Sequence, residues 1–574
     1  MPYDYHAPLR EMRFVIERVL DAPSSWRACT AFVDVDAETA AAVLDEAARF
    51  AREVLLPLNA HGDVEGCTRG ADGAVRTPAG FREAYRAFVD GGWPALPCAP
   101  KWGGQGLPLL LDAAVREMLD ACNHAWNMYP DLLHGAYETL AAHAGDELKA
   151  RYLPMIASGE WLAAMALTEP QAGSDLGALR TRAEPQSDGS VRVTGQKVFI
   201  SGGDHDLTDN IVHLVLCRLP DSPPGSRGLS LALVPKVLPD GARNAMHCDG
   251  LERKMGIHGS ATCAMRYEGA TGWLVGEPHR GLAAMFLMMN SARLHVGLQG
   301  LGHLEMAAQN ARRHAAERVQ FGRPIAEHPA VRHALLRLRV LAEALRVIAY
   351  RAALALDEAA HLADAARRER AGRLAALLTP VVKAWCTHHG FHGASAALQV
   401  FGGYGYVREV GVEQTLRDAR IAMVYEGTNE IQAIDLVQRK LLADGGATLA
   451  ALLDDHDAEA ARCAADPALA GFADALRQHT GAARDGFAAL QRAVATDPEA
   501  PLRVADDVLA GLAHTLMAWA FAASARAAAH DADAGWAAAK VARMRYGVQW
   551  LLPQAAVHWQ RVAQAPTPLP AAAG

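Results

Sequence analysis

Apolar residues recur at helical spacing over three long parts of the chain. In the first, about residues 37–160, Ala, Val and Leu alternate with charged residues in steps of three and four. In the second, beyond Gly281, the segment from Val331 to Arg346 places leucines on one face and charges on the others. The third follows a glycine turn after Leu442 and is rich in Ala. These patterns predict helical domains, with an antiparallel bundle in the second part.

The stretch between the first two helical parts has a different pattern. Runs rich in β-branched residues at 191–200, 211–216 and 229–234 are separated by Pro and Gly, which is typical of strands joined by turns. We therefore predict a mainly α chain with a central β-domain. The expected domains are an N-terminal extension (1–36), an N-terminal helical domain (37–160), the β-domain (161–280), a helical bundle domain (281–445) and a C-terminal helical domain (446–574).

Length and composition limit what such a chain does. A chain of 574 residues is too long for one hydrophobic core and is expected to hold several domains. Its formal net charge of −8 argues against a general polyanion binder, although a local basic pocket for a phosphorylated ligand stays open. Nine cysteines are scattered singly without CxxC spacing, which predicts reduced thiols in a cytoplasmic protein.

The N-terminal sequence and the apolar runs bear on membrane attachment. Charged residues interrupt the segment from Met1 to Leu20, so we expect a short amphipathic helix there and no signal peptide. No run approaches eighteen apolar residues without a charge, so we expect no membrane span. The chain is predicted to be soluble.

The entrance to the predicted β-domain carries the first candidate site. The segment from Leu167 to Leu176 combines hydroxyl side chains with a glycine turn after an apolar strand. Free backbone N–H groups around such a turn form a concavity that binds anions, which suits a planar ligand with a phosphate tail. A capped turn uses the same residue types, so this segment alone leaves both interpretations open.

Aromatic and glycine-rich segments form a second group of candidates. Phe199 and Ser201 end a strand, where the ring could cover an aromatic cofactor or belong to the core. Arg318 and Phe321 lie in a cationic turn, and the segment from Gln399 to Tyr406 contains glycines that permit close backbone approach. Neither segment has the GxGxxG of nicotinamide binding, and the sequence has no Walker loop.

Metal and hydrolase chemistry have weak support. His388 and His392 share a helix face, but the carboxylate of an HExxH motif is missing and no cysteine stands at useful spacing. We interpret them as interface histidines and predict no metal. The sequence also lacks the GxSxG elbow of a serine hydrolase.

A carboxylate stands in the segment from Val424 to Gln432, between a long apolar-periodic region and another helical run. Glu426 lies there between Tyr425 and Gly427. It belongs either to a catalytic loop or to a turn in which an acidic side chain is simply exposed to water. The segment alone does not separate these interpretations.

Four of these segments together resemble the signature set of the acyl-CoA dehydrogenase flavoproteins, over about residues 40–442. The extra C-terminal region and the segments 205–212 and 254–262 are similar to the long branch that includes 3-methylmercaptopropionyl-CoA dehydrogenases and broad-range acyl-CoA dehydrogenases. The resemblance implies an acyl-CoA dehydrogenase-like fold with an added C-terminal helical domain. The four segments are Leu167 to Asp175, Arg318 to Pro324, Gln399 to Tyr406 and Tyr425 to Gln432.

The resemblance implies an FAD site. Leu167 and Thr168 would bond the pyrimidine edge of the flavin, and Ser174 the pyrophosphate. Phe199 stands where family members carry Trp against the ring, and Ser201 where they carry Thr near N5. These departures bear on flavin tuning more than on flavin binding.

Further positions imply a homo-oligomer, with a dimer favoured. In the family, residues matching four positions contact the FAD of a neighbouring subunit, and Thr428 would lie near the same cofactor. Glu430 replaces the amide common at its position. The four positions are Arg318, Phe321, Gln399 and Gly403.

The resemblance also implies the reaction. Glu426 would remove the α-proton of an acyl-CoA thioester while hydride leaves the β-carbon for flavin N5, giving the 2,3-enoyl-CoA. The backbone N–H of the base and a ribityl hydroxyl would polarise the thioester carbonyl. Some relatives take the base from the helix near Asn290, but Ala292 has no carboxylate. An electron-transfer flavoprotein is the expected electron acceptor.

Two alternatives stay open at this point. An acyl-CoA oxidase shares the base, the FAD and extra C-terminal helices, but is reoxidised by O₂. A DNA-associated flavoprotein of the alkylation response uses the same scaffold. Nucleic-acid binding needs a basic stripe, whereas the C-terminal region opens with Asp454, Asp455 and Asp457, so we expect no nucleic acid.

Overall fold

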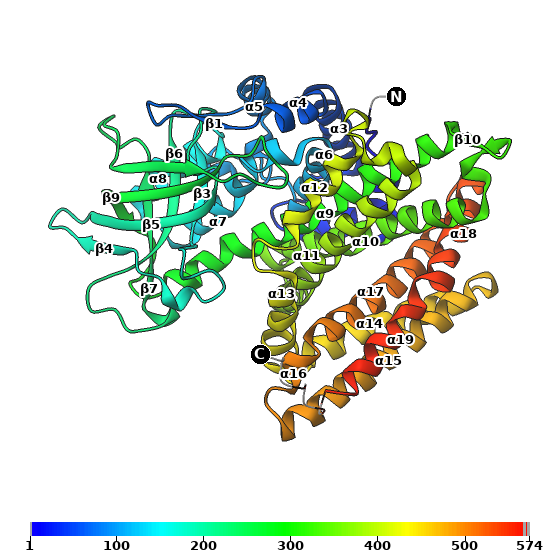
Figure 1. The fold of residues 1–574 in the computed structure, drawn as a ribbon. Helices are drawn as coiled ribbons and strands as arrows, with labels where there is room; N and C mark the ends of the chain where they lie inside the picture. Colours follow the sequence, from blue (N-terminus) through cyan, green and yellow to red (C-terminus); the bar gives the residue numbers. More distant parts are fainter. Residues whose placement is uncertain (1–2, 566, 568–569, 571–574) are drawn as a thin grey trace. The chain divides into compact units, whose positions relative to one another are not determined.

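The computed structural model describes residues 3–565, 567 and 570 of the chain. Its contacts divide the chain into two compact units, each discontinuous in sequence. Helices α6 (Leu109–Asn127) and α9 (Gly281–Glu317), both labelled in Figure 1, contribute residues to both units. Unit 1 comprises Met1–Ala48, Leu109–Ala121 and Val296–Gly574, and unit 2 comprises Arg49–Pro108 and Cys122–His295. The domain limits expected from the sequence stay a prediction.

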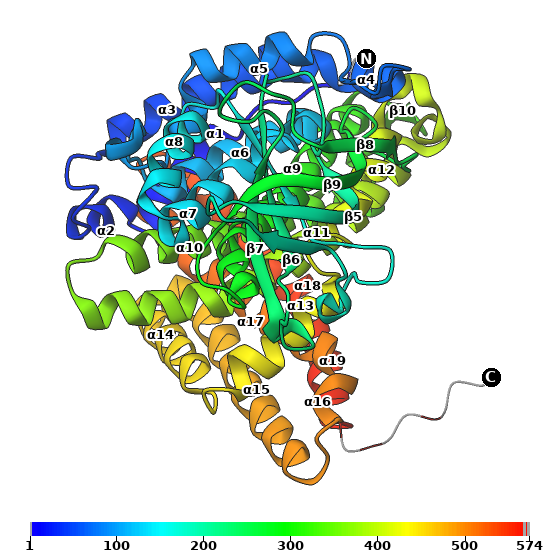
Figure 2. The same ribbon diagram turned by 90° about the vertical axis from the view of Figure 1, so that its left-hand side faces the viewer.

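Unit 2 contains the predicted β-domain, a seven-stranded sheet, of which β5 and β9 are seen side by side in Figure 2. Strand β7 pairs with both β6 and β9, so the ladder closes on itself. The three runs predicted as strands are β5, β6 and β7. The strands are β3 (Leu162–Ala166), β4 (Arg182–Pro185), β5 (Val191–Ser201), β6 (Ile211–Arg218), β7 (Leu229–Pro235), β8 (Met246–Leu251) and β9 (Thr262–Leu274).

The burial of each strand follows its sequence pattern. In β5, Val191 and Val193 are buried whereas Arg192 and Thr194 are exposed, because alternate side chains of a strand point to opposite faces. In β7 every residue is buried, and its sequence is correspondingly an almost unbroken apolar run. This buried sheet is the frame that carries the loops after β3 and β5.

Helices and a short hairpin complete unit 2. The indole of Trp126 is fully buried and donates to the carbonyl of Phe81, 3.1 Å away. Its ring also meets Phe88 edge-on, with centroids 5.4 Å apart. These elements are α4 (Leu56–Glu65), the hairpin β1 (Thr68–Arg69) and β2 (Val75–Arg76), α5 (Phe81–Asp90), α7 (Leu133–His143) and α8 (Asp146–Ala157).

Unit 1 contains a bundle built on α9, α10 (Pro329–His361) and α11 (Ala365–Phe401). The helix predicted from Val331 to Arg346 lies within α10. Glycines allow α9 and α11 to cross closely: a Cβ at Gly300 would lie 2.5 Å from the Cys386 carbonyl group, and one at Gly390 would lie 2.5 Å from the Gly300 oxygen. Any larger residue at either position would force the helices apart.

The remaining helices of unit 1 precede α6 or follow α11 in the chain. The expected amphipathic N-terminal helix is α1, whose Met12 and Phe14 are buried. The Ala-rich region predicted as helical is also helical. These elements are α1 (Leu9–Phe14), α2 (Ala22–Ala28), α3 (Ala37–Phe50), the hairpin β10 (Val319–Gln320) and β11 (Arg323–Pro324), α12 (Val412–Ala422), α13 (Asn429–Asp435), α14 (Ala447–Ala464), α15 (Ala470–Thr496), α16 (Ala500–Arg503), α17 (Ala505–Ala528), α18 (Ala534–Trp550) and α19 (Ala555–Val562).

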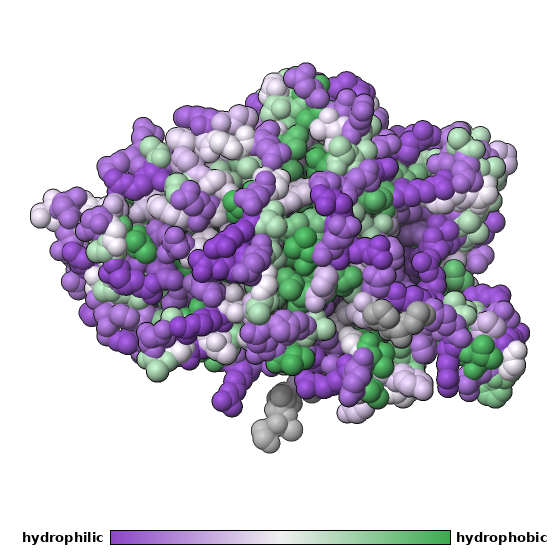
Figure 3. Space-filling model, turned by 90° about the horizontal axis from the view of Figure 1, so that it is seen from above, coloured by the Kyte–Doolittle hydropathy of each residue, from purple (hydrophilic) through white to green (hydrophobic). Residues whose placement is uncertain are grey.

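Helix α17 corrects the expectation that no run approaches eighteen apolar residues without a charge. Residues 508–525 carry no Asp, Glu, Lys or Arg, and within the described residues α17 alone is long and apolar enough to cross a membrane by length and composition. Its apolar window is entirely buried, and α15, α18 and α19 pack against it. An all-round apolar helix is what the core of a large protein requires. By contrast, the face of the molecule in Figure 3 is mostly hydrophilic.

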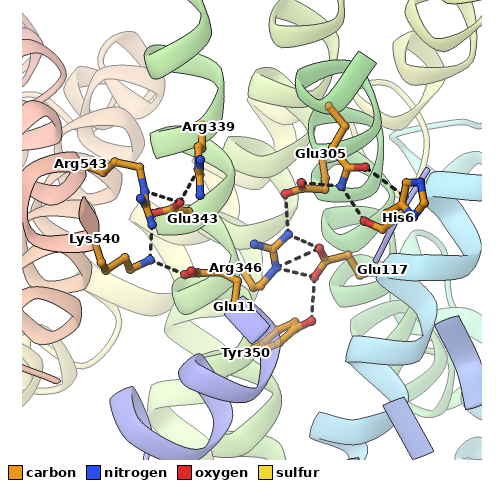
Figure 4. A network of polar contacts seen from close by, with 11 residues as sticks. His6, Glu11, Glu117, Glu305, Arg339, Glu343, Arg346, Tyr350, Lys540 and Arg543 are labelled. Carbon is orange, nitrogen blue, oxygen red and sulfur yellow. Dashed lines mark hydrogen bonds and ion pairs between the residues drawn. The ribbon is translucent and has the colours of Figure 1, made fainter. Parts of the chain in front are cut away.

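A buried ion cluster joins α1, α10 and α18. The fully buried ammonium group of Lys540 donates to Glu11 and, at 2.9 Å, to Glu343. Glu343 also accepts from Arg543 at 2.8 Å and from Arg339 at 3.0 Å (Figure 4). Burial opposes the charge of Glu343, but these three cations outweigh it and lower its pKa to about 2. The cluster therefore holds the two ends of the chain on one bundle helix.

A second buried cluster lies on the next turn of α10. Arg346 is fully buried and bonds Glu117 of α6 at 2.5 Å and Glu305 of α9 at 2.8 Å. The Tyr350 hydroxyl donates to Glu117 at 2.7 Å (Figure 4). Breaking such a pair leaves an uncompensated buried charge, so removing one partner would destabilise the contact between these helices.

Candidate active site

The Glu426 loop connects α12 and α13 in unit 1. Glu426 has a backbone φ of 57°, and Gly427 follows at 85°. A non-glycine residue pays a steric cost in this left-handed region, and such residues gather where a structure over-determines a functional geometry. The Glu426 side chain is half-buried, which excludes a fully exposed acid in a surface turn.

Polar contacts hold this loop against α11. The fully buried ammonium group of Lys383 donates to the Gly427 carbonyl at 2.7 Å and to the Asn429 side chain at 3.0 Å. The Gln432 amide donates to the Glu426 carbonyl at 2.9 Å. The strained backbone is therefore fixed at the Glu426 carbonyl and directly after it.

Two neighbours of Glu426 are anchored separately. The Tyr425 hydroxyl donates to the side chain of Gln299 on α9, 2.5 Å away. The Thr428 hydroxyl accepts from the Ile431 N–H at 3.4 Å and so caps α13. Thr428, expected near the cofactor, thus has a structural role at the start of this helix.

Phe199 and Ser201 lie at the end of β5 in unit 2. The register with β9 shifts between Lys197 and Ile200, which releases Phe199 from regular pairing. Phe199 has a φ of 61°, and 62% of the residue is exposed within the described chain. Ser201 is half-buried and pairs with Thr262 of β9. The ring of Phe199 is therefore not part of the core of unit 2.

The turn after β3 lies beside this segment. The Leu167 carbonyl accepts from the Lys197 ammonium group at 2.8 Å, and the Thr168 carbonyl accepts from the Val198 N–H at 2.9 Å. Ser174 is exposed, and a Cβ built on Gly173 would meet nothing within 4 Å. Unit 2 thus brings the two predicted segments, at Leu167 and at Phe199, together.

Glu169 holds that turn through hydrogen bonds of its side chain. Its carboxylate is almost fully buried and accepts from Lys197 at 2.9 Å, the Thr181 hydroxyl at 2.6 Å and the Arg180 N–H at 2.8 Å. Burial opposes the charge, but Lys197 and these hydrogen bonds outweigh it and lower the pKa of Glu169 to about 2. Glu169 is therefore an ionised structural group and a poor proton acceptor.

In unit 1 the structure also brings the Arg318 and Gly403 segments together. The Arg318 guanidinium group lies 5.7 Å from the centre of the Tyr404 ring. Phe321, at the tip of the β10–β11 hairpin, has a φ of 53° and is 94% exposed. Gln399 is exposed near the end of α11, and a Cβ on Gly403 would meet nothing within 4 Å.

The histidines of α11 pack among aromatic rings. His388 and His392 have ring centroids 4.3 Å apart, and Trp385 stacks on His388 at 5.5 Å. Trp385 also meets His514 of α17 edge-on at 5.1 Å. Burial lowers the pKa of His388 to about 4, so it packs as a neutral ring. Over residues 3–565, 567 and 570, no His, Cys, Asp or Glu side chains gather in threes to hold a metal.

Sequence reasoning did not identify Lys383, which holds the Glu426 loop, or Lys197, which holds the turn after β3. Lys383 lies between Val382 and Ala384 in a buried helix, and Lys197 lies in a strand. A lysine among apolar neighbours at a core position is the signal that could have found them, because a buried ammonium group needs several acceptors.

Four family models match consecutive parts of the chain. One relative, the 3-methylmercaptopropionyl-CoA dehydrogenase of Ruegeria pomeroyi, is 40% identical over 587 residues, covering 97% of this chain and 98% of its own. The matching models are the acyl-CoA dehydrogenase N-terminal domain (37–160), middle domain (164–270) and C-terminal domain (279–442), and the acetyl-CoA dehydrogenase C-terminal-like domain (447–572).

Two solved structures share the fold. Caenorhabditis elegans ACDH-11, in complex with C11-CoA, superposes with a TM-score of 0.79 at 19% identity, covering 96% of this chain and 92% of its own. An acyl-CoA dehydrogenase from Bacillus anthracis, complexed with FAD, gives 0.77 at 20% identity, covering 95% and 91%. They confirm the predicted mainly α fold with a central β-domain and extra C-terminal helices. Together with the domain models and the full-length relative, this fold establishes that the chain belongs to the acyl-CoA dehydrogenase family of oxidoreductases.

Proposed function

We propose that the protein oxidises an acyl-CoA thioester to the 2,3-enoyl-CoA, with FAD as cofactor and Glu426 as the base. One observation carries the assignment of the base: Glu426 is held at a strained φ of 57° by a loop that a buried lysine fastens to α11. A structure keeps such a costly conformation where function needs it. Similarity over 97% of this chain to a relative named 3-methylmercaptopropionyl-CoA dehydrogenase supports the reaction class.

The residues of unit 2 fit FAD. The exposed ring of Phe199 offers a flat apolar surface for an aromatic ring system, and the Ser201 hydroxyl follows it. Leu167 and Thr168 lie next to this segment, and the open turn at Ser174 suits a pyrophosphate. We assign these five residues to one end of the cofactor, and the family resemblance also assigns Thr428 a position near FAD.

The chain itself supplies the proton chemistry and the orientation. Glu426 would take the weakly acidic α-proton, which a positioned carboxylate accelerates by about 10²–10⁴-fold. Its backbone N–H would donate to the thioester carbonyl and stabilise the developing enolate charge. FAD, when bound, supplies the hydride acceptor at N5. Lys383 and Gln432 act on neither substrate nor cofactor in this proposal, but fix the loop that presents Glu426.

A pair of isosteric variants tests the base. Glu426→Gln is expected to keep yellow, FAD-loaded protein and to lose acyl-CoA oxidation by about 10²–10⁴-fold. The matched control is Glu430→Gln, an identical change at an exposed position in the same loop region, which should keep the activity. Full activity of Glu426→Gln in a dye-reduction assay would remove Glu426 from the mechanism.

The electron acceptor and the assembly belong to the same proposal. We assign an electron-transfer flavoprotein as acceptor in a cytoplasmic setting, and stoichiometric peroxide on aerobic turnover would instead make the protein an oxidase. Phe321, 94% exposed, and Tyr406, 88% exposed, present aromatic surface that a second copy would cover in a homodimer. Arg318, Gln399 and Gly403 belong to the same surface. Sedimentation of the wild type and Phe321→Ala tests this, because a dimer should dissociate at higher concentration in the variant.

A further inference from the structure

Two buried cysteines face each other across adjacent strands of unit 2. Cys248 of β8 pairs with Met265 of β9, and Leu251 pairs with Cys263, with an irregularity in register at residue 249. Residues two apart on a strand project to the same face, so Cys263 shares the face of Met265 and lies diagonally from Cys248. The Cys248 thiol donates to the Gly250 carbonyl at 3.3 Å and the Cys263 thiol donates to the Asp204 carbonyl at 3.7 Å, and each thiol shifts the pKa of the other.

One of the two cysteines borders an open cavity whose lining carries both signs of charge. Cys248 lines this cavity of 560 Å³ together with Arg69, Lys236 and Arg243 and with the carboxylates of Asp72, Asp204 and Asp206. The Arg69 guanidinium group donates to the Cys248 carbonyl at 2.7 Å. Cys248 is only 2% exposed and Cys263 is fully buried, so a small oxidant in this cavity would meet Cys248 first.

The two thiols have unequal acidity. The neighbouring Cys263 side chain lowers the pKa of Cys248, and the Gly250 hydrogen bond and the charge of Arg69 act in the same direction against the effect of burial. The Cys248 side chain and burial raise the pKa of Cys263. A thiol whose pKa is lowered beside one whose pKa is raised is the arrangement of an attacking and a resolving cysteine.

Five other cysteines differ from Cys248 because their pKa is raised. Burial raises the pKa of each, to about 12 for Cys217 and about 11 for Cys29. Thiols of this kind are inert, because the thiolate is the reactive form. The remaining members of this group are Cys67, Cys386 and Cys463.

We propose that Cys248 and Cys263 form a redox modification site that a peroxide converts into a reversible disulfide. The Cys248 thiolate attacks one peroxide oxygen, the O–O bond breaks, and a sulfenic acid and one water form once a proton is taken up. The Cys263 sulfur then attacks the Cys248 sulfur, loses its proton, and expels the hydroxyl group as a second water. Two thiols and one hydrogen peroxide thus give one disulfide and two waters.

The disulfide would act on the segment that follows Ser201. The Cys263 sulfur accepts from the Asp204 N–H at 3.3 Å, and a Cβ on Gly203 would lie 3.1 Å from the Cys263 Cβ. Asp204 in turn pairs with Lys236 at 2.7 Å. Because diagonal strand positions lie farther apart than the Cβ atoms of a disulfide, closure must shift the strands and with them this segment.

Peptide mapping of the native full-length protein tests the proposal without an activity assay. After treatment with hydrogen peroxide, alkylation and digestion with trypsin under non-reducing conditions, residues 244–253 and 255–266 each contain one cysteine. We expect these two peptides to appear linked, at about 2 Da below the sum of their masses, and to separate on reduction with dithiothreitol.

Three serine variants complete the test. Cys248→Ser and Cys263→Ser should each abolish the linked pair, whereas Cys217→Ser, a buried thiol on β6 of the same sheet, should retain it. The wild-type protein decides the matter even where a variant folds poorly. Peroxide-treated wild type in which both peptides stay unlinked, or in which Cys248 proceeds to the sulfinic acid, would overturn the proposal.

Discussion

The buried ammonium group of Lys383 donates a hydrogen bond to the carbonyl of Gly427, 2.7 Å away, directly after the proposed base. We expect Lys383→Met, which keeps the length of the side chain, to lower kcat by about 10²-fold, because a displacement of about 1 Å in a reacting group has effects of this size. KM and FAD content should stay near the wild-type values. Steady-state kinetics with a dye acceptor measure both parameters.

Lys440→Met is the matched control for this change, since Lys440 is only half-buried in the segment Leu436–Leu442 after α13. It should leave kcat unchanged. An equal loss of kcat in both variants, or a Lys383→Met enzyme that merely unfolds at lower temperature without a change in kcat, would contradict a positioning role.

Phe199→Ala should weaken FAD binding about tenfold, because an aromatic contact contributes about 0.5–1.5 kcal/mol beyond area burial. The unfolding temperature of the FAD-free protein should hardly change, since the side chain is largely exposed. Phe199→Trp should retain FAD. Titration of the FAD-free protein by flavin fluorescence gives the dissociation constants. Val64→Ala, at a residue of the same unit that is 87% exposed, serves as the control and should bind FAD as the wild type does.

Unit 2 should lose stability in acid through Glu169. Its pKa of about 2 in the folded protein lies below the ordinary value of 4.5, so the folded state favours the ionised form. The stabilisation is complete above pH 4.5 and is lost as the pH falls toward 2, by about 3 kcal/mol in total. Hydrogen exchange of the β5 amides at pH 5, 4 and 3 measures it.

Glu169→Gln removes this pH dependence and leaves the fully buried Lys197 without its anion. The expected cost is about 3–5 kcal/mol at neutral pH. If the β5 amides of the variant and the wild type respond equally to acid, Glu169 is not the group responsible.

Lys540→Met should loosen both ends of the chain in unit 1. The change leaves Glu11 and Glu343 buried with one cation fewer, at an expected cost of about 3–5 kcal/mol. Exchange should accelerate in α1 and α18 together. Arg477→Met, at an exposed pair on α15, should leave exchange unchanged. Acceleration confined to α18 would mean that Lys540 does not hold the N-terminal helix.

The spacing of apolar residues was sufficient to predict the elements in which buried positions recur at a regular period. Strands β5, β6 and β7 and helix α10 follow from alternation and from leucine spacing. The exposed ring of Phe199 could not be predicted, because an aromatic residue in a strand fits a core position equally well. Its release depends on the register shift with β9, a pairing that local sequence does not contain.

Contacts between segments that are distant in the sequence could not be predicted either. Glu11 and Lys540 pair across nearly the whole length of the chain, and Glu169 reaches Lys197 from a neighbouring turn. Spacing within one element says nothing about such pairs. The candidate residues of the active site came from family motifs, whereas the lysines that fix their loops emerge only from the tertiary structure.

The burial of α17 has a consequence for how the C-terminal region can be separated from the rest. This helix packs against α10, α11 and α13 as well as against its C-terminal neighbours, and all of these belong to one compact unit. Deleting residues 447–574 would strip apolar faces from the same helices that carry Lys383 and the Glu426 loop. The region is therefore not a detachable module, and a truncated enzyme would report on the integrity of the bundle before it reported on any separate role of these helices.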